Sequence, residues 1–130
     1  MTFKEVATMV ASIGPDTAYY QFPDGTEQAT PFICFYYEGD NDFKADNLNY
    51  QKVEHLVIEL YTDNKDFEQE AAVEEVLASY GFAWSRSEQW IDSERMQMVV
   101  YETDVLITPE PPAPDTSQET ENTEELNNGE

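Results

Sequence analysis

The sequence has few positive charges and a single cysteine. Its 130 residues include 6 Lys and Arg against 28 Asp and Glu, which gives a formal net charge of −22 at pH 7. A duplex-binding surface needs a basic patch that displaces counterions from phosphate, so we expect no specific nucleic-acid binding. The only cysteine, Cys34, leaves no intramolecular disulfide to form and is typical of a reducing compartment.

Long apolar runs are also missing. No segment approaches the roughly 18 apolar residues of a membrane span, and the first 14 residues lack the basic and apolar blocks of a signal peptide. We therefore expect that the protein is made in the cytoplasm and that it does not associate with a membrane. The length suits one domain, and 40% hydrophobic with 13% aromatic residues is enough for a core.

The acidic residues continue into a C-terminal segment of different composition. Residues 108–130 contain seven acids and four prolines but no Lys, Arg or aromatic residue. Such a segment buries too little apolar surface to offset the entropy of ordering its backbone. We predict a folded domain over 1–107 and a disordered acidic tail over 108–130.

A short amphipathic helix is predicted at the start of the chain. Thr2 and Glu5 have the spacing of a capping box, and apolar residues then recur at helical spacing to residue 13. Gly14 and Pro15 are typical of a helix end. We predict a helix over 3–13.

Two β-prone segments follow this helix. Residues 18–22 and the aromatic run 32–37 are separated by turn residues, and we predict that they form a hairpin with a loose connection near 23–30. The polar stretch 39–47 is predicted as a loop. Beyond it, 50–61 is predicted as a long strand whose residues alternate between an apolar face (Leu56, Ile58, Leu60) and a second face (His55, Val57, Glu59, Tyr61).

The rest of the domain is predicted as one helix and two strands. The helix covers 65–80, with Asp63 or Asn64 as its N-cap. Strands at 82–91 and 96–107 flank a turn. The order is α-β-β-β-α-β-β, which predicts an α+β fold: a mostly antiparallel sheet of about five strands with both helices packed on one face.

Two residues could in principle support nucleophilic catalysis. His55 is the only histidine and lies in a predicted strand, where a structural or surface role is far commoner than a catalytic one. Cys34 lies in an aromatic strand, where a buried thiol behaves as a small hydrophobe. A Cys–His pair stays open as a minor alternative. No motif for phosphate, zinc or an activated serine is present, so we predict no enzyme activity, no catalytic residues and no cofactor.

The acidic loop resembles a calcium-binding loop only superficially. Asp40 and Asp42 match the first two ligand positions of an EF-hand, but the third is Lys44, the glycine position is Ala45 and the closing glutamate position is Gln51. We interpret the segment as a solvated loop and predict no metal site.

Aromatic residues are the other excess, with 8 Tyr, 7 Phe and 2 Trp. Trp84 and Trp90 have even spacing, so they share one sheet face, and we place them with Tyr61 and Val57 on the face that the helices leave uncovered. If these four side chains are exposed, they form an apolar patch that indicates binding of a protein partner. The alternative is that these aromatics complete a small core, and both interpretations stay open.

Three strings carry a resemblance to a known family. YYQFPDGTEQATPFICFYYEGDNDF, NLNYQKVEHLVIELYTDNKD and EAAVEEVLASYGFAWSRSEQWIDSERMQMVVYETDVL, in this order, resemble the tail-completion or tail-terminator (head–tail joining) proteins of long-tailed bacteriophages and prophages. The resemblance covers roughly residues 1–107 and rests on architecture and sequence texture, since the family has no invariant catalytic motif.

The resemblance implies a structural virion protein of the tail or neck, made in the cytoplasm of the host bacterium. Such proteins form rings, commonly hexameric, that complete the tail, contact the tail-tube protein and the head connector, and line a channel through which DNA passes. By analogy, the loop at 39–47 would reach a neighbouring ring. The partner-binding residues predicted on this basis, together with the two tryptophans, are Asp40, Asp42, Phe43, Lys44, Asp46, Trp84 and Trp90.

Two other functions remain open. The chain could be a different neck protein from the same module, such as a connector adaptor or another minor structural protein. It could also be an acidic binding module that mimics DNA by presenting carboxylates in place of phosphates.

Overall fold

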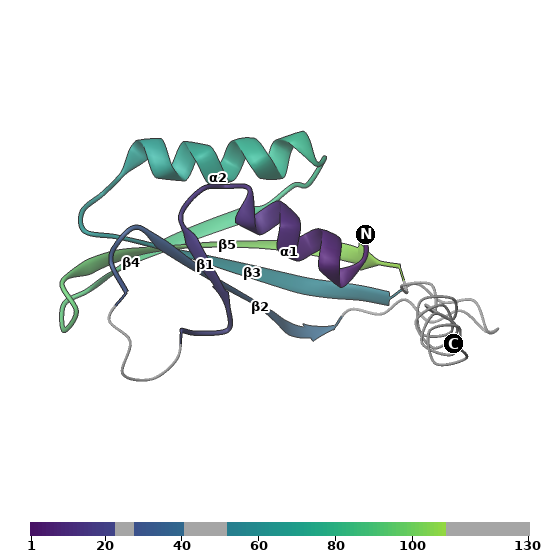
Figure 1. Ribbon diagram of the computed structural model, residues 1–130, viewed down its shortest axis with the longest axis horizontal. Helices are drawn as coiled ribbons and strands as arrows, with labels where there is room; N and C mark the ends of the chain where they lie inside the picture. Colours follow the sequence, from purple (N-terminus) through teal and green to yellow (C-terminus); the bar gives the residue numbers. More distant parts are fainter. Residues whose placement is uncertain (23–27, 41–51, 109–130) are drawn as a thin grey trace, which may run out of the picture.

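Two helices lie side by side on one face of a five-stranded sheet (Figure 1). This computed structural model describes residues 1–22, 28–40 and 52–108. The elements in chain order are α1 (Phe3–Ala11), β1 (Asp16–Tyr19), β2 (Phe32–Asp40), β3 (Lys52–Thr62), α2 (Phe67–Ser79), β4 (Ser85–Ile91) and β5 (Met96–Ile107). The predicted α+β class and the order of its elements are confirmed.

The strand order across the sheet is β1-β2-β3-β5-β4. Three of the four pairings are antiparallel, but β1 and β2 are parallel, with Asp16 opposite Phe32. The predicted hairpin of 18–22 with 32–37 is therefore wrong. A parallel pair needs a crossover of about a dozen residues, and the segment between Tyr19 and Phe32 has that length. The chain leaves the sheet at Tyr20, whose φ is 73°.

Both helices press apolar residues onto the same sheet face. Alternate residues of β2, β3 and β5 point to this face, and α1 and α2 cover them. Because the side chains of a strand alternate between faces, one register fixes the whole core. Its fully buried members include Val6, Met9 and Val10 of α1, Val73 and Leu77 of α2, and Ile33, Leu56, Ile58, Leu60, Val99, Tyr101 and Val105 of the sheet.

The helix starts are set by side-chain caps. The capping box of α1 is confirmed: the Glu5 amide donates to Thr2 Oγ1 at 3.1 Å, and the Thr2 amide donates to Glu5 Oε1 at 2.8 Å. The N-cap of α2 is Asp66, which accepts from the Gln69 amide at 3.1 Å. The expected cap at Asp63 or Asn64 is wrong, because β3 runs on to Thr62 and α2 starts only at Phe67.

The two tryptophans lie on the helix side of the sheet. Trp90 is opposite Gln97, and Glu88, two residues before it on the same face, reaches Lys65 at the start of α2. Trp84 packs against the helix-covered core. Their predicted place on the uncovered face is therefore wrong, because the short turn between β4 and β5 gives β4 the opposite register. Trp90 is still 43% exposed at the rim.

The two ends of the domain meet. The Thr108 amide donates to the Met1 carbonyl at 2.7 Å, which joins the first residue of the chain to the residue that follows β5. Figure 1 shows both ends at one edge of the molecule, opposite the β4–β5 turn. Within the part of the chain that the structure describes, neither helix has the length and apolar character needed to cross a lipid bilayer.

Candidate functional site

The sheet face opposite the helices is the candidate site, and we call it the open face. Neither α1 nor α2 covers it (Figure 1). Cross-strand register aligns its side chains in three rows. Reading from β2 through β3 and β5 to β4, these rows are Phe32, Tyr61, Met98 and Gln89; Cys34, Glu59, Val100 and Ser87; and Tyr36, Val57, Glu102 and Ser85. The predicted second face of residues 55–61 is confirmed as part of this surface.

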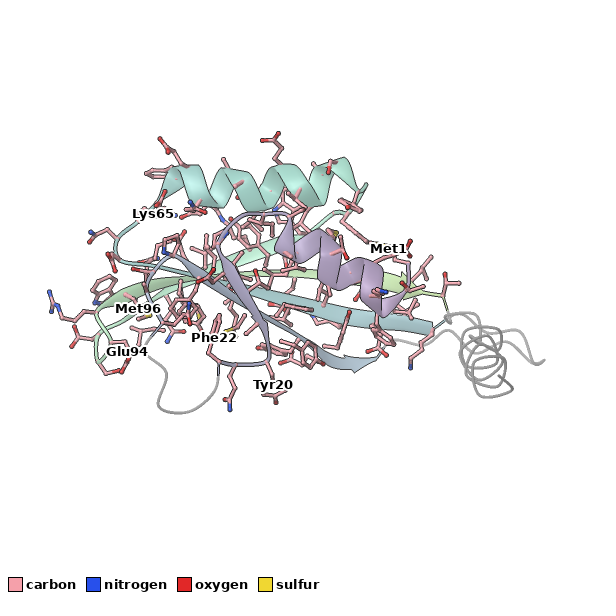
Figure 2. All side chains as sticks on the ribbon, viewed as in Figure 1. Met1, Tyr20, Phe22, Lys65, Glu94 and Met96 are labelled. Atoms are coloured by element: carbon pink, nitrogen blue, oxygen red, sulfur yellow. The ribbon has the colours of Figure 1, made fainter. Side chains whose placement is uncertain are left out.

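A groove of about 680 Å³ lies at the end of the open face nearest the β4–β5 turn. Its floor comes from β2 and β3, one wall from the segment that follows β1, and the other wall from the β4–β5 turn. Figure 2 shows Tyr20, Phe22 and Glu94 on the side of the sheet away from the helices. The lining residues are Tyr20, Gln21, Phe22, Gln28, Phe32, Cys34, Glu59, Tyr61, Ile91, Glu94 and Met96.

Glu59 is the charged group on the floor of this groove. Tyr36 donates its hydroxyl to Glu59 Oε2 at 2.9 Å, and Tyr61 donates to Oε1 at 2.7 Å. Burial and the Glu59 carboxylate raise the pKa of Tyr36 to about 12 and also raise that of Tyr61, so both phenols keep the protons that they donate. Phe32 stacks on Tyr61 with ring centroids 4.7 Å apart, which fixes the ring that holds Glu59.

Cys34 lines the same groove but is not activated. Burial, followed by the charge of Glu59, raises the pKa of its thiol to about 11, so the nucleophilic thiolate is scarce at neutral pH. Cys34 is opposite Glu59, and His55 is four residues away along β3, about 13 Å at the usual rise per residue. The structure therefore separates the two members of the Cys–His pair considered from sequence.

His55 lies between two carboxylates farther along the open face. Its Nε2 is 2.7 Å from Glu102 Oε1, and its Nδ1 is 2.9 Å from Asp104 Oδ1. These two hydrogen bonds, first to Glu102 and then to Asp104, raise the pKa of His55 above its ordinary 6.5. An imidazolium with both N–H groups donated accounts for this geometry.

His55 and Glu102, together with Glu38, form the only group of metal-type donors among the residues the structure describes. Ligand atoms of Glu38, His55 and Glu102 lie within 4.8 Å of one another. They could hold a cation if the Nε2 proton of His55 were lost. Exposed acidic groups often gather without a metal, and both ring nitrogens already contact carboxylates, so we assign no metal here.

The His55 cluster makes stability depend on pH in one direction. Folding raises the pKa of His55, so the protonated imidazole stabilises the folded state. This stabilisation is complete below about pH 6.5, the ordinary pKa of histidine, and is lost as the pH rises through the higher pKa of His55 in the folded protein. The charges facing His55 are Glu38 from β2 and Glu102 and Asp104 from β5. His55→Gln is expected to cost more unfolding free energy at pH 6 than at pH 9, by under about 1 kcal/mol because the pair is solvent-exposed.

Urea denaturation of the wild type and His55→Gln at the two pH values measures this difference. The ordinary pKa values of carboxylates lie below this interval, so the change reports mainly on the imidazole. If His55→Gln lost the same unfolding free energy at pH 6 and pH 9, or lost more at pH 9, the result would contradict an imidazolium that bridges the two carboxylates.

Most of the predicted contact loop lies outside the described residues. This applies to Asp42, Phe43, Lys44 and Asp46, as well as to the tail from residue 109. Asp40 is the last residue of β2 and is opposite Glu54. Of the predicted contact residues that the structure describes, Asp40 is on β2 and is separated by β3 and β5 from β4, which contains Trp90 and follows Trp84.

A second cavity lies beside the edge strand β1. It measures about 520 Å³ and is lined by Phe3, Ala7, Tyr19, Phe35, Tyr37 and Glu54. Tyr19 is 53% exposed at its rim. β1 pairs with β2 only from Phe32 to Phe35, although β2 continues to Asp40. Among the described residues, no strand pairs with this last part of β2 on the β1 side, so the sheet has an edge next to an apolar cavity.

The groove around Glu59 was missed at the sequence level. The alternation of 55–61 placed Glu59 and Tyr61 on one face, but nothing in the sequence shows that β2 supplies a second tyrosine to the same carboxylate. The partners of His55 on β5 were missed for the same reason. Both depend on strand register, which alternation alone does not fix.

Comparison with known proteins shows a weak structural likeness to a virion component. No family model matches the sequence, and no curated protein matches it. One solved chain, from a structure described as the virion of a native gene transfer agent particle, overlays with a TM-score of 0.47 at 16% identity. The match covers 80% of this chain and 88% of that one. A likeness at this level transfers no function to this chain.

Proposed function

We propose that this chain is a structural protein of a tailed phage or phage-like particle, and that it forms a ring, of six subunits by analogy, at the head-proximal end of the tail. The ring completes the tail and joins it to the head connector. The sequence resemblance over residues 1–107 suggests this role. The structural observation that carries it is the open face, a broad sheet surface that neither of the two described helices covers.

The open face suits protein contact better than chemistry. It combines aromatic and apolar side chains with the carboxylates of Glu59 and Glu102, and its one described cysteine has a raised thiol pKa. A groove of this size bounded by aromatic residues is a place where a neighbouring protein can insert side chains. A sheet whose described helices cover only one face is therefore a good building block for a layered assembly.

Ring closure would use the sheet edges. β2 extends beyond its pairing with β1, and the apolar cavity lined by Phe3, Tyr19 and Tyr37 lies next to that edge. A strand from the next subunit could add its backbone hydrogen bonds there and place an apolar side chain in the cavity. Such head-to-tail contacts generate rings when the rotation between subunits closes.

Charge opposes this assembly in free solution. Copies with a net charge of −22 repel one another, and the repulsion is screened beyond about 8–10 Å at physiological ionic strength. We expect a monomer at low salt and micromolar concentration, and rings when tail tubes or connectors provide a template. The same negative charge on a channel wall would let DNA slide without sticking.

Two measurements test the proposal. Sedimentation of the purified protein in 20 mM and 500 mM NaCl is expected to show a monomer in the first and more association in the second. Immunogold electron microscopy of particles from the source strain is expected to place the protein at the head–tail junction. Absence from particles would overturn the structural role, and a stable hexamer in 20 mM NaCl would overturn template dependence.

The same images separate the closest alternative. A tail terminator binds the ends of isolated tail tubes, whereas a connector adaptor remains with heads that have lost their tails. Gold label on tailless heads alone would favour the adaptor.

A further inference from the structure

We infer that the groove on the open face binds an arginine side chain from a different protein. This inference deepens the proposed function, because it assigns a chemistry to the partner that covers the open face. It stands on the charge, the aromatic floor and the shape of the groove.

The groove contains negative charge and no described positive charge. Glu59 lies on its floor and Glu94 on its wall, and no Lys, Arg or His is among its described lining residues. Glu59 is partly buried and receives two phenol hydroxyls, but none of the ion pairs found between described residues includes it. A carboxylate held in a groove without a counter-ion attracts a cation strongly, since the surrounding protein screens it less than water does.

The aromatic floor favours a planar cation. Phe32 and Tyr61 are stacked beside Glu59, and Tyr20 and Phe22 form the adjacent wall. A guanidinium can lie on an aromatic ring while donating two parallel N–H bonds to one carboxylate, which a lysine ammonium does less well. Each Glu59 oxygen accepts one phenol and keeps a second lone pair for such a bond.

The apolar wall suggests that the arginine is part of a polypeptide. Ile91 and Met96 line the groove beside the charged group, and about 680 Å³ is more than a single side chain fills. An arginine flanked by apolar residues would pair with the carboxylate through its guanidinium and contact the apolar wall through its neighbours. A second copy of this chain is the less favourable occupant, because its net charge of −22 opposes the approach.

The test uses a peptide with one positive charge. The probe is a nine-residue peptide, blocked at both ends, with a central arginine between leucine and tyrosine, and the matched peptide carries the neutral isostere citrulline. In titrations of the full chain followed by NMR, the arginine peptide is expected to shift the amides of 32–36 and 59–61. The citrulline peptide should bind at least tenfold more weakly.

Paired variants locate the binding. Glu59→Gln keeps the shape, since its carbonyl oxygen can accept from one tyrosine while its NH2 group donates to the hydroxyl oxygen of the other. It is expected to weaken binding of the arginine peptide at least tenfold. Glu75→Gln removes the same charge from the exposed face of α2 and should change the affinity less than twofold. If Glu59→Gln loses the dispersed spectrum of the folded protein, Glu94→Gln in the exposed turn replaces it, with an expected loss of about threefold.

Several results would overturn the inference. Equal losses for Glu59→Gln and Glu75→Gln would show only diffuse attraction to an acidic protein, and so would equal binding of the citrulline peptide. Shifts confined to the helix side would place the peptide elsewhere. Self-association lost in both Glu59→Gln and Arg95→Gln would identify a second copy as the occupant. If the protein were absent from particles, the proposed function would be rejected, but arginine-peptide binding in the groove would still stand as measured.

Discussion

Replacing Leu60 by alanine is expected to lower the free energy of unfolding by about 2–5 kcal/mol. Leu60 is fully buried near the end of β3, on the sheet face that the helices cover and between Ile33 of β2 and Val99 of β5. The substitution removes three carbon atoms from a site closed on every side, so the lost transfer energy is joined by the cost of a cavity. For a small domain this loss is a large part of the total stability.

Leu106→Ala is the matched control. Leu106 has the same side chain and lies near the end of β5, but it is 56% exposed. The same truncation there should change the unfolding free energy by less than about 0.5 kcal/mol. Urea denaturation followed by far-UV circular dichroism measures both variants. Similar losses in the two would contradict the assignment of the core to the helix-covered face.

Glu70→Lys is expected to destabilise the protein by about 3–5 kcal/mol. The Glu70 side chain is 4% exposed, and its oxygens lie 2.9 Å from Lys65 Nζ and 3.0 Å from Arg86 Nη1. A lysine at this position would bury a third positive charge against the two cations that now neutralise the carboxylate. The helix would have to shift on the sheet, or the ammonium would have to lose its proton.

Glu75→Lys separates this local effect from net charge. Glu75 lies on the exposed side of the same helix, so the charge change is identical while the surroundings are aqueous. On a protein with a net charge of −22, an added positive charge should leave stability unchanged or raise it slightly. In urea denaturation, Glu70→Lys is expected to lower the unfolding free energy, and Glu75→Lys is expected to leave it unchanged or raise it slightly. If Glu70→Lys were also tolerated, the ion pairs joining α2 to β4 would be too weak to hold the helix.

The parts of the fold that local chemistry determines could be read from the sequence. The Thr2 and Glu5 cap needs only residues three apart, and the core face of β3 follows from the alternate positions of Leu56, Ile58 and Leu60. The boundaries of β5 were also obtained, because turn residues precede it and the acidic tail follows it. Each of these features is decided within about a dozen residues.

The sequence-based predictions that are wrong concern features that depend on contacts between distant segments. β1 and β2 pair in parallel although twelve residues separate them, and composition does not encode that pairing. Trp84 and Trp90 were assigned to the wrong face because β4 takes its register from β5 across a turn. The groove combines β2, β3 and the β4–β5 turn, so Glu59 gains its surroundings only after the sheet has formed.

The hydrogen bond between Thr108 and Met1 has a geometric consequence for any rotationally symmetric arrangement of subunits. It places the exit point of residues 109–130 beside the start of α1 at a single corner of the domain. Rotation about a common axis would bring every such corner to the same rim. The segment that carries seven carboxylates would then be attached at that one rim in every copy.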